Sequence, residues 1–133
     1  MLLAPDEQAG QWVRLAALAH GLDHAVCHKD RHGDRDVDVV LPCQPVAGRA
    51  VVLLDDGAST GRTLASAARA ALAQGALSVD VAVAHELFVG DAWAEVKAAG
   101  VRHVWSSNSV PHASNAVDLV PLLARALLPL GAC

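Results

Sequence analysis

The chain has 133 residues, which is enough for one compact domain and too few for two ordinary ones. Apolar residues make up 53% of the sequence and charged residues 18%, a balance that excludes an intrinsically disordered protein. The net charge is −4 and the ten Lys and Arg residues are scattered, so no basic face for nucleic acid is expected.

Further features of the sequence restrict the cellular compartment and the number of domains. No apolar run approaches the roughly 18 residues that a membrane span needs, and residues 1–6 lack the basic and apolar parts of a signal peptide. The cysteines, Cys27, Cys43 and Cys133, form no Cys-x-x-Cys pair, which favours a reducing cytoplasm over a disulfide framework. No repeat or linker divides the sequence, so we predict one domain over residues 1–133.

The predicted secondary structure alternates short apolar strands with alanine-rich amphipathic helices. In chain order we expect strands over residues 2–4, 24–27, 37–41, 50–54, 79–84, 102–105 and 117–120, and helices over residues 7–20, 63–74, 91–99 and 121–128. The first helix should bury Trp12, Leu15, Ala16 and Ala19. By composition, the charged segment 29–36 is typical of a solvated hairpin tip. The alternation predicts an α/β fold with a parallel sheet and right-handed crossovers.

The strand at 50–54 and the polar loop after it carry the strongest functional signal. The strand is continuously apolar, which indicates burial on both faces of the sheet. Ligands of such sheets bind beyond the carboxyl ends of the strands, where residues 55–63 are expected. The hydroxyls of Ser59, Thr60 and Thr63, with free N–H groups at a helix N-terminus, are suited to hold an anion.

Two adjacent acids in the same loop indicate more than a phosphate site. Asp55 and Asp56 would repel a bare phosphate, but carboxylates accept sugar hydroxyls, and Mg²⁺ offsets their charge. A phosphorylated sugar satisfies both halves of the loop. The alternative is a polar turn in which Ser59 or Thr60 is an ordinary helix N-cap.

Five segments, taken in order, share a pattern with one known family. They are residues 4–6 (Ala-Pro-Asp), 29–31 (Lys-Asp-Arg), 51–63 (Val-Val-Leu-Leu-Asp-Asp-Gly-Ala-Ser-Thr-Gly-Arg-Thr), 84–92 (Ala-His-Glu-Leu-Phe-Val-Gly-Asp-Ala) and 107–112 (Ser-Asn-Ser-Val-Pro-His). The third resembles the ribose 5-phosphate loop of type I phosphoribosyltransferases. Together the five resemble the C-terminal half of the ribose-phosphate pyrophosphokinases, whose first half has no counterpart in residues 1–133.

The resemblance implies a phosphoribosyltransferase-like, Rossmann-like parallel sheet flanked by helices. It also implies a Mg²⁺-dependent reaction of ATP with ribose 5-phosphate that gives AMP and 5-phosphoribosyl 1-diphosphate (PRPP) in a cytoplasmic homo-oligomer. ATP would bind only with the first half present, so little turnover is expected from this segment alone. The roles implied are Lys29 and Arg31 in catalysis, Asp6 at the pyrophosphate, Asp6 and Asp55 at the metal, and Asp55, Asp56, Ser59, Thr60, Gly61, Arg62 and Thr63 at ribose 5-phosphate.

Three departures from the family pattern keep other functions open. The family has a bulky aliphatic residue at Gly57, a glycine pair at Gln8-Ala9, and arginine at Asp30. These departures favour a non-catalytic regulatory relative, whereas the intact acid pair opposes it. A PRPP-consuming phosphoribosyltransferase is the other rival, although no aromatic-rich segment supplies a base-binding hood. His85 and His112 match family positions and are assigned no chemistry.

Overall fold

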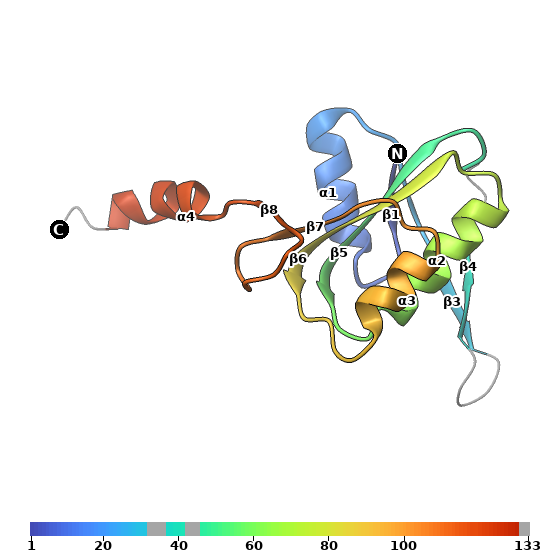
Figure 1. The fold of residues 1–133 in the computed structure, drawn as a ribbon. Coiled ribbons are helices and arrows are strands. Elements are labelled where there is room, and N and C mark those ends of the chain that lie inside the picture. Colours follow the sequence, from blue (N-terminus) through green and yellow to red (C-terminus); the bar gives the residue numbers. More distant parts are fainter. Residues whose placement is uncertain (32–36, 42–45, 131–133) are drawn as a thin grey trace.

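A computed structural model describes residues 1–31, 37–41 and 46–130 of the chain (Figure 1). The strands are β1 (Leu2–Ala4), β2 (His24–Val26), β3 (His28–Arg31), β4 (Val37–Val40), β5 (Ala50–Ala58), β6 (Ser78–Glu86), β7 (Val104–Ser107) and β8 (Asn115–Val117). The helices are α1 (Gly10–His20), α2 (Arg62–Ala73), α3 (Ala92–Ala98) and α4 (Val120–Leu127), followed by a short 3₁₀ turn, Leu128–Leu130. In this part of the chain, every helix is too short or too polar to span a membrane.

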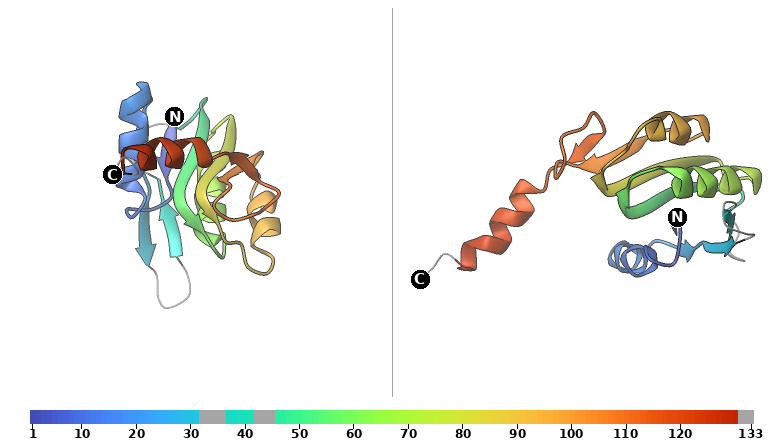
Figure 2. Two further views of the ribbon diagram at one scale, coloured as in Figure 1. Left: turned by 90° about the vertical axis from the view of Figure 1, so that its left-hand side faces the viewer. Right: turned by 90° about the horizontal axis from the view of Figure 1, so that it is seen from below.

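Six strands form one sheet in the order β2-β1-β5-β6-β7-β8, and every neighbouring pair is parallel. Helix α1 lies on one face, and α2 and α3 lie on the other (Figure 2). Alternation along β1 and β5 explains the two layers, because successive side chains point to opposite faces. Leu3 and Leu53 belong to the large core under α2, whereas Ala4 and Leu54 pack with Val13 of α1. The predicted α/β fold with a parallel sheet is confirmed.

The start and the buried face of the first helix differ from the prediction. The carboxylate of Asp6 accepts the N–H groups of Gln8 and Ala9, which makes a turn, and the helix begins only at Gly10. Its buried residues are Val13 and Ala17. Ala16 is half-buried, while Trp12, Leu15 and Ala19 are exposed. The prediction of four buried residues is wrong because the side of α1 that faces the sheet is the one that carries Val13 and Ala17.

Strand β5 is longer and less covered than the sequence predicts. It continues to Ala58 and stays paired with β6, so Asp55 and Asp56 lie in the strand rather than in a loop. Val51 and Leu53 are fully buried, but Val52 and Leu54 on the other face are only partly buried. The prediction that this strand is buried on both faces of the sheet is therefore correct for one face only. The other predicted elements are present, with ends shifted by up to three residues.

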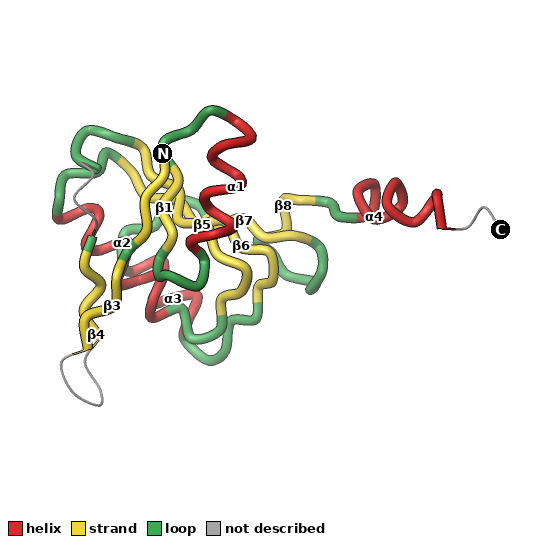
Figure 3. Tube along the Cα trace, turned by 180° about the vertical axis from the view of Figure 1, so that it is seen from behind, coloured by secondary structure: helices red, strands yellow, loops and turns green. Residues whose placement is uncertain are grey.

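The charged segment forms the second, two-stranded sheet. β3 and β4 pair antiparallel, with Lys29 opposite Val39 and Arg31 opposite Val37 (Figure 3). Residues 29–31, predicted as part of the hairpin tip, are therefore paired strand residues. The rest of the predicted tip, residues 32–36, lies outside the described residues.

Candidate functional site

The predicted loop residues line a cleft of about 240 Å³ at the carboxyl edge of the sheet. Strands β1 and β5 are neighbours, so Asp6, which follows β1, comes to the same edge as Asp55. The lining residues are Asp6, Gln8, Asp55, Asp56, Gly57, Ala58, Ser59, Thr60, Gly61, Thr63 and Leu64. The lining therefore combines three acids with small and hydroxyl residues.

Residues 59–61, which we name the phosphate turn, connect β5 to α2. Gly61 precedes the helix with φ of 70°, in the left-handed region that favours glycine. A Cβ placed there would lie 2.9 Å from Val96 Cγ2 and 3.1 Å from the carbonyl oxygen of Ala92. Only glycine therefore lets the turn pack against α3 in this way. The first N–H groups of α2, which have no partner within the helix, open at this turn.

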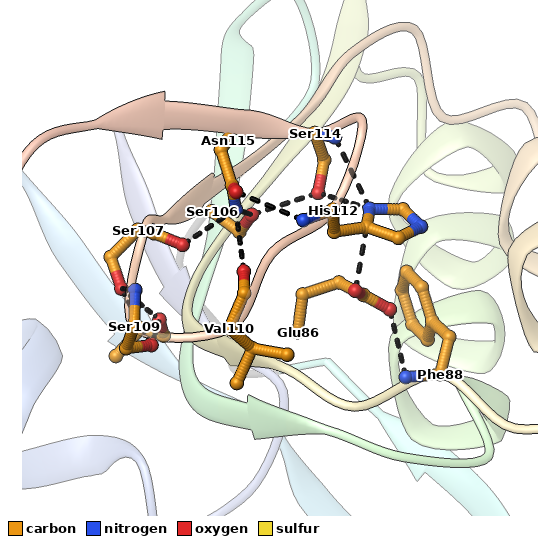
Figure 4. Close-up of polar contacts among 10 residues, drawn as sticks. Glu86, Phe88, Ser106, Ser107, Ser109, Val110, His112, Ser114 and Asn115 are labelled. Carbon is orange, nitrogen blue, oxygen red and sulfur yellow. Dashed lines mark hydrogen bonds and ion pairs between the residues drawn. The ribbon is translucent and has the colours of Figure 1, made fainter.

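A second turn, residues 86–89, supports the phosphate turn from the side. The N–H of Val89 donates to the carbonyl of Ser59 (3.1 Å), and the N–H of Leu87 donates to that of Ala58 (2.9 Å). The buried carboxylate of Glu86 accepts the N–H of Phe88 at 2.8 Å. Its other oxygen lies 3.3 Å from Nδ1 of His112 (Figure 4). These residues belong to segment 84–92, which carries part of the resemblance, but no role was predicted for Glu86.

His112 and His85 take part in local hydrogen bonds. Nδ1 of His112 lies 2.8 Å from Oγ of Ser114, which lies 2.8 Å from Oγ of Ser106 (Figure 4). Nδ1 of His85 lies 2.8 Å from Oγ of Ser109. Neither histidine lines the cleft. These hydrogen bonds are consistent with assigning the two histidines no chemistry.

Crowded carboxylates dominate the electrostatics of the cleft. Burial is the largest of the causes that together raise the pKa of Asp55 to about 6, and the neighbouring carboxyl groups of Asp6 and Asp56 contribute smaller upward shifts. A single hydrogen bond opposes this, because the N–H of Asp56 donates to Oδ1 of Asp55 at 2.9 Å. Ionising Asp55 therefore costs free energy in the folded chain, and a bound cation would lower that cost.

The oxygen donors of the cleft fit Mg²⁺ better than a softer metal. Mg²⁺ commonly binds through one or two carboxylates together with substrate oxygens and water. Among the described residues, no group of three His, Cys, Asp or Glu side chains is placed to hold a metal. Asp6 and Asp55 would therefore need oxygens from a ligand to complete the coordination sphere.

Not every predicted site residue reaches the cleft. Arg62 does not line it and is exposed on the first turn of α2. Lys29 and Arg31 lie on β3, in the separate two-stranded sheet. Conversely, Gln8 lines the cleft although no role was predicted for it. The available signal was the resemblance, in which the family has a glycine pair at Gln8-Ala9.

Comparison with known proteins covers nearly all of the chain. It is 36% identical over 127 residues to the ribose-phosphate pyrophosphokinase of Methanosarcina acetivorans, which covers 96% of this chain and 45% of that protein. It is 33% identical over 134 residues to ribose-phosphate pyrophosphokinase 2 of Saccharomyces cerevisiae, with 96% and 42% covered. The chain thus spans less than half the length of the curated relatives that it matches. No family model matches it.

Solved structures agree with the sequence comparison. Phosphoribosylpyrophosphate synthetase from Mycobacterium smegmatis aligns with a TM-score of 0.78 and 26% identity, over 97% of this chain and 44% of that one. Orotate phosphoribosyltransferase from Aeropyrum pernix, at 21% identity, shares the fold with a TM-score of 0.60, over 79% of this chain and 57% of that one. The chain therefore has the fold of the type I phosphoribosyltransferases. Within that class, it is a homologue of the ribose-phosphate pyrophosphokinases.

Proposed function

We propose that the cleft binds a phosphopentose, ribose 5-phosphate or PRPP, together with Mg²⁺. The observation that carries the proposal is the meeting of an acid pair and a helix N-terminus in one cleft of about 240 Å³. Asp55 and Asp56 would repel a ligand that is phosphate alone. A phosphorylated sugar, in contrast, offers hydroxyls to the carboxylates and a phosphate to the helix N-terminus.

Each part of the cleft then has a task. The carboxylates of Asp55 and Asp56 accept the ring hydroxyls, and the amides and hydroxyls of residues 59–63 hold the 5-phosphate. Asp6, which lines the same cleft, would contact a pyrophosphate group attached to the sugar. Asp6 and Asp55 would hold Mg²⁺, which would supply neutralisation of the phosphate charge.

We propose further that residues 1–133 form one domain equivalent to the C-terminal half of a ribose-phosphate pyrophosphokinase. In such an enzyme the anomeric hydroxyl of ribose 5-phosphate attacks the β-phosphorus of ATP, AMP leaves, and PRPP forms. Diphosphoryl transfer depends mainly on positioning and charge neutralisation. Lys29 and Arg31 would stabilise the transferring group. ATP would bind to the other half, so the 133-residue chain should bind the sugar and turn over little.

Calorimetric titration of the 133-residue chain with ribose 5-phosphate tests the binding step. Binding should need Mg²⁺ and should be lost with ribose, which lacks the phosphate. The double variant Asp55→Asn, Asp56→Asn should weaken it at least tenfold. A double variant of the exposed α3 residues, Asp91→Asn with Glu95→Gln, removes equal charge outside the cleft and should bind normally. Equal affinity in both double variants would overturn the proposal.

Product analysis tests the remaining step. Incubation of the purified chain with ATP, Mg²⁺ and ribose 5-phosphate should yield almost no AMP, although the sugar binds. Robust AMP formation would show that the half-enzyme interpretation is wrong while leaving the binding site intact.

A further inference from the structure

Glu86, the last residue of β6, is a buried acid that does not itself reach the cleft. It is 4% exposed, and it lines neither the cleft nor the apolar groove of about 460 Å³ beside α1. Burying a carboxylate is costly unless its oxygens have hydrogen-bond partners. Here one oxygen accepts the N–H of Phe88 at 2.8 Å, and the other lies 3.3 Å from Nδ1 of His112 (Figure 4). Both oxygens therefore hold neighbouring parts of the chain.

The hydrogen bond to Phe88 shapes the second turn, residues 86–89. It satisfies the middle N–H of the turn within the turn itself. The N–H groups of the residues before and after Phe88 donate outside the turn, to the carbonyls of Ala58 and Ser59 at 2.9 and 3.1 Å. The two bonds that reach the phosphate turn and its first neighbour thus flank the bond that Glu86 accepts.

The planarity of the peptide unit carries this support into the phosphate turn. In a trans peptide, the carbonyl and the following N–H point in opposite directions. Holding the carbonyls of Ala58 and Ser59 therefore also directs the N–H groups of the next residues, Ser59 and Thr60. Among the residues that the structure describes, neither of these N–H groups has a hydrogen-bond acceptor. Ser59 and Thr60 line the cleft and the second turn does not, so both N–H groups are available to an anion in the cleft.

Aromatic rings contact His112, the partner of the second oxygen of Glu86. The His112 ring lies edge-on to Trp93 of α3, with ring centroids 5.2 Å apart, and to Phe88 at 6.4 Å. Phe88 and Trp93 also meet edge-on at 5.9 Å. Because His112 faces Glu86, these contacts fix the carboxylate from the second turn, from α3 and from the segment before β8.

We propose that Glu86 is a positioning residue of the cleft, which directs the N–H groups of Ser59 and Thr60 at the ligand phosphate without touching the ligand. This role rests on the proposed function, because the phosphate is that of a phosphopentose in the cleft. Without the acceptor on Glu86, the N–H of Phe88 needs another partner, and the second turn has to rearrange. The ligand must then order the phosphate turn as it binds, which lowers its affinity.

Calorimetric titration with ribose 5-phosphate and Mg²⁺ tests this role on the 133-residue chain. Glu86→Met fills a similar volume but removes both acceptors, so it should weaken binding about tenfold or more. Glu86→Gln keeps an oxygen for the N–H of Phe88 and should bind within about threefold of the wild type. The matched control is Asp80→Ala, which removes a buried acid near the opposite end of β6 and should bind normally despite its lower stability. Equal weakening by Glu86→Met and Asp80→Ala would overturn the proposal.

A substitution in the second turn tests the same bonds without changing the buried acid. Val89 is 57% exposed, so its side chain can be replaced with little effect on the core. Val89→Pro removes the N–H that donates to Ser59 and should weaken binding about tenfold or more. Val89→Ala keeps that N–H and should bind like the wild type. Normal binding by Val89→Pro would overturn the proposal even if Glu86→Met failed to fold.

Hydrogen exchange followed by NMR distinguishes failure of this role from failure of the proposed function. In Glu86→Met, the amides of Leu87 and Val89 should exchange about tenfold or more faster, measured against the amide of Val83 inside β6. Asp80→Ala should leave that ratio unchanged. A wild-type chain that binds no sugar would overturn the proposed function and this role with it. An unchanged ratio in Glu86→Met would overturn this role alone.

Discussion

Replacing Asp55 by Asn should stabilise the folded chain at neutral pH. The folded state holds the proton of Asp55 up to about pH 6, whereas the unfolded chain releases it near pH 3.8. As the pH rises between these values, ionisation therefore costs the folded state more than the unfolded state. Asn keeps the Oδ1 acceptor that the N–H of Asp56 uses. The substitution thus removes the charge while retaining the local hydrogen bond.

The size of the effect follows from the two pKa values. At about 1.4 kcal/mol per pKa unit, the rise from 3.8 to about 6 corresponds to about 3 kcal/mol. Asp55 keeps part of its surface in water, so we expect Asp55→Asn to add about 1–3 kcal/mol to the free energy of unfolding at pH 7.5. At pH 4, where most of the folded wild type holds the proton, the gain should nearly vanish.

Urea unfolding at fixed protein concentration, followed by tryptophan fluorescence at pH 4 and pH 7.5, measures this difference. Asp56→Asn is the matched comparison, because it removes a repelling neighbour but leaves the buried carboxylate, so its gain should be smaller. Millimolar Mg²⁺ should stabilise the wild type at pH 7.5 more than Asp55→Asn. A variant that gains the same stability at both pH values, or loses stability at pH 7.5, would refute the reasoning.

Three further predictions concern packing and burial. Gly61→Ala should cost about 1–3 kcal/mol of stability and weaken ribose 5-phosphate binding, whereas Gly57→Ala, whose Cβ meets nothing closer than 3.9 Å, should be nearly neutral; urea unfolding and calorimetry distinguish them. Cys27 is buried, and burial raises its pKa to about 12. Peptide mass spectrometry after iodoacetamide treatment should therefore show alkylation of Cys27 only once the chain unfolds, and rapid labelling of Cys27 in the native chain would contradict this. Although burial raises it, the hydrogen bonds from Arg102 and His103 hold the pKa of Asp80 below its ordinary value, so its stabilisation is present at neutral pH and is lost as the pH falls below 4. Asp80→Ala should therefore cost about 2–4 kcal/mol at pH 7, and an equal cost at pH 3 would argue against the pairing.

The order of strands and helices could be predicted from the sequence because local patterns determine it. The apolar run before Asp55 and the Gly61-containing turn after it needed no knowledge of distant residues. Burial did depend on distant residues. Trp12 is apolar and lies on an amphipathic helix, yet it is exposed because it lines an open apolar groove beside α1 rather than the core.

Only those parts of the candidate site that are contiguous in the sequence could be predicted. The acid pair and the phosphate turn are contiguous in sequence, so their proximity follows from a single turn. The position of Gln8 depends on β1 lying next to β5, which the sequence pattern did not specify. The support from Glu86 depends on a hydrogen bond to a backbone group two residues later, and periodicity does not show such contacts.

Asp55 and Asp56 line both the polar cleft and the apolar groove. A molecule bound in the groove would therefore change the hydration of Asp55 and Asp56. A cation bound to these two carboxylates would in turn change the charge of the groove wall. Thermodynamic linkage makes the two effects equal in size, because each binding event alters the equilibrium constant of the other by one common factor.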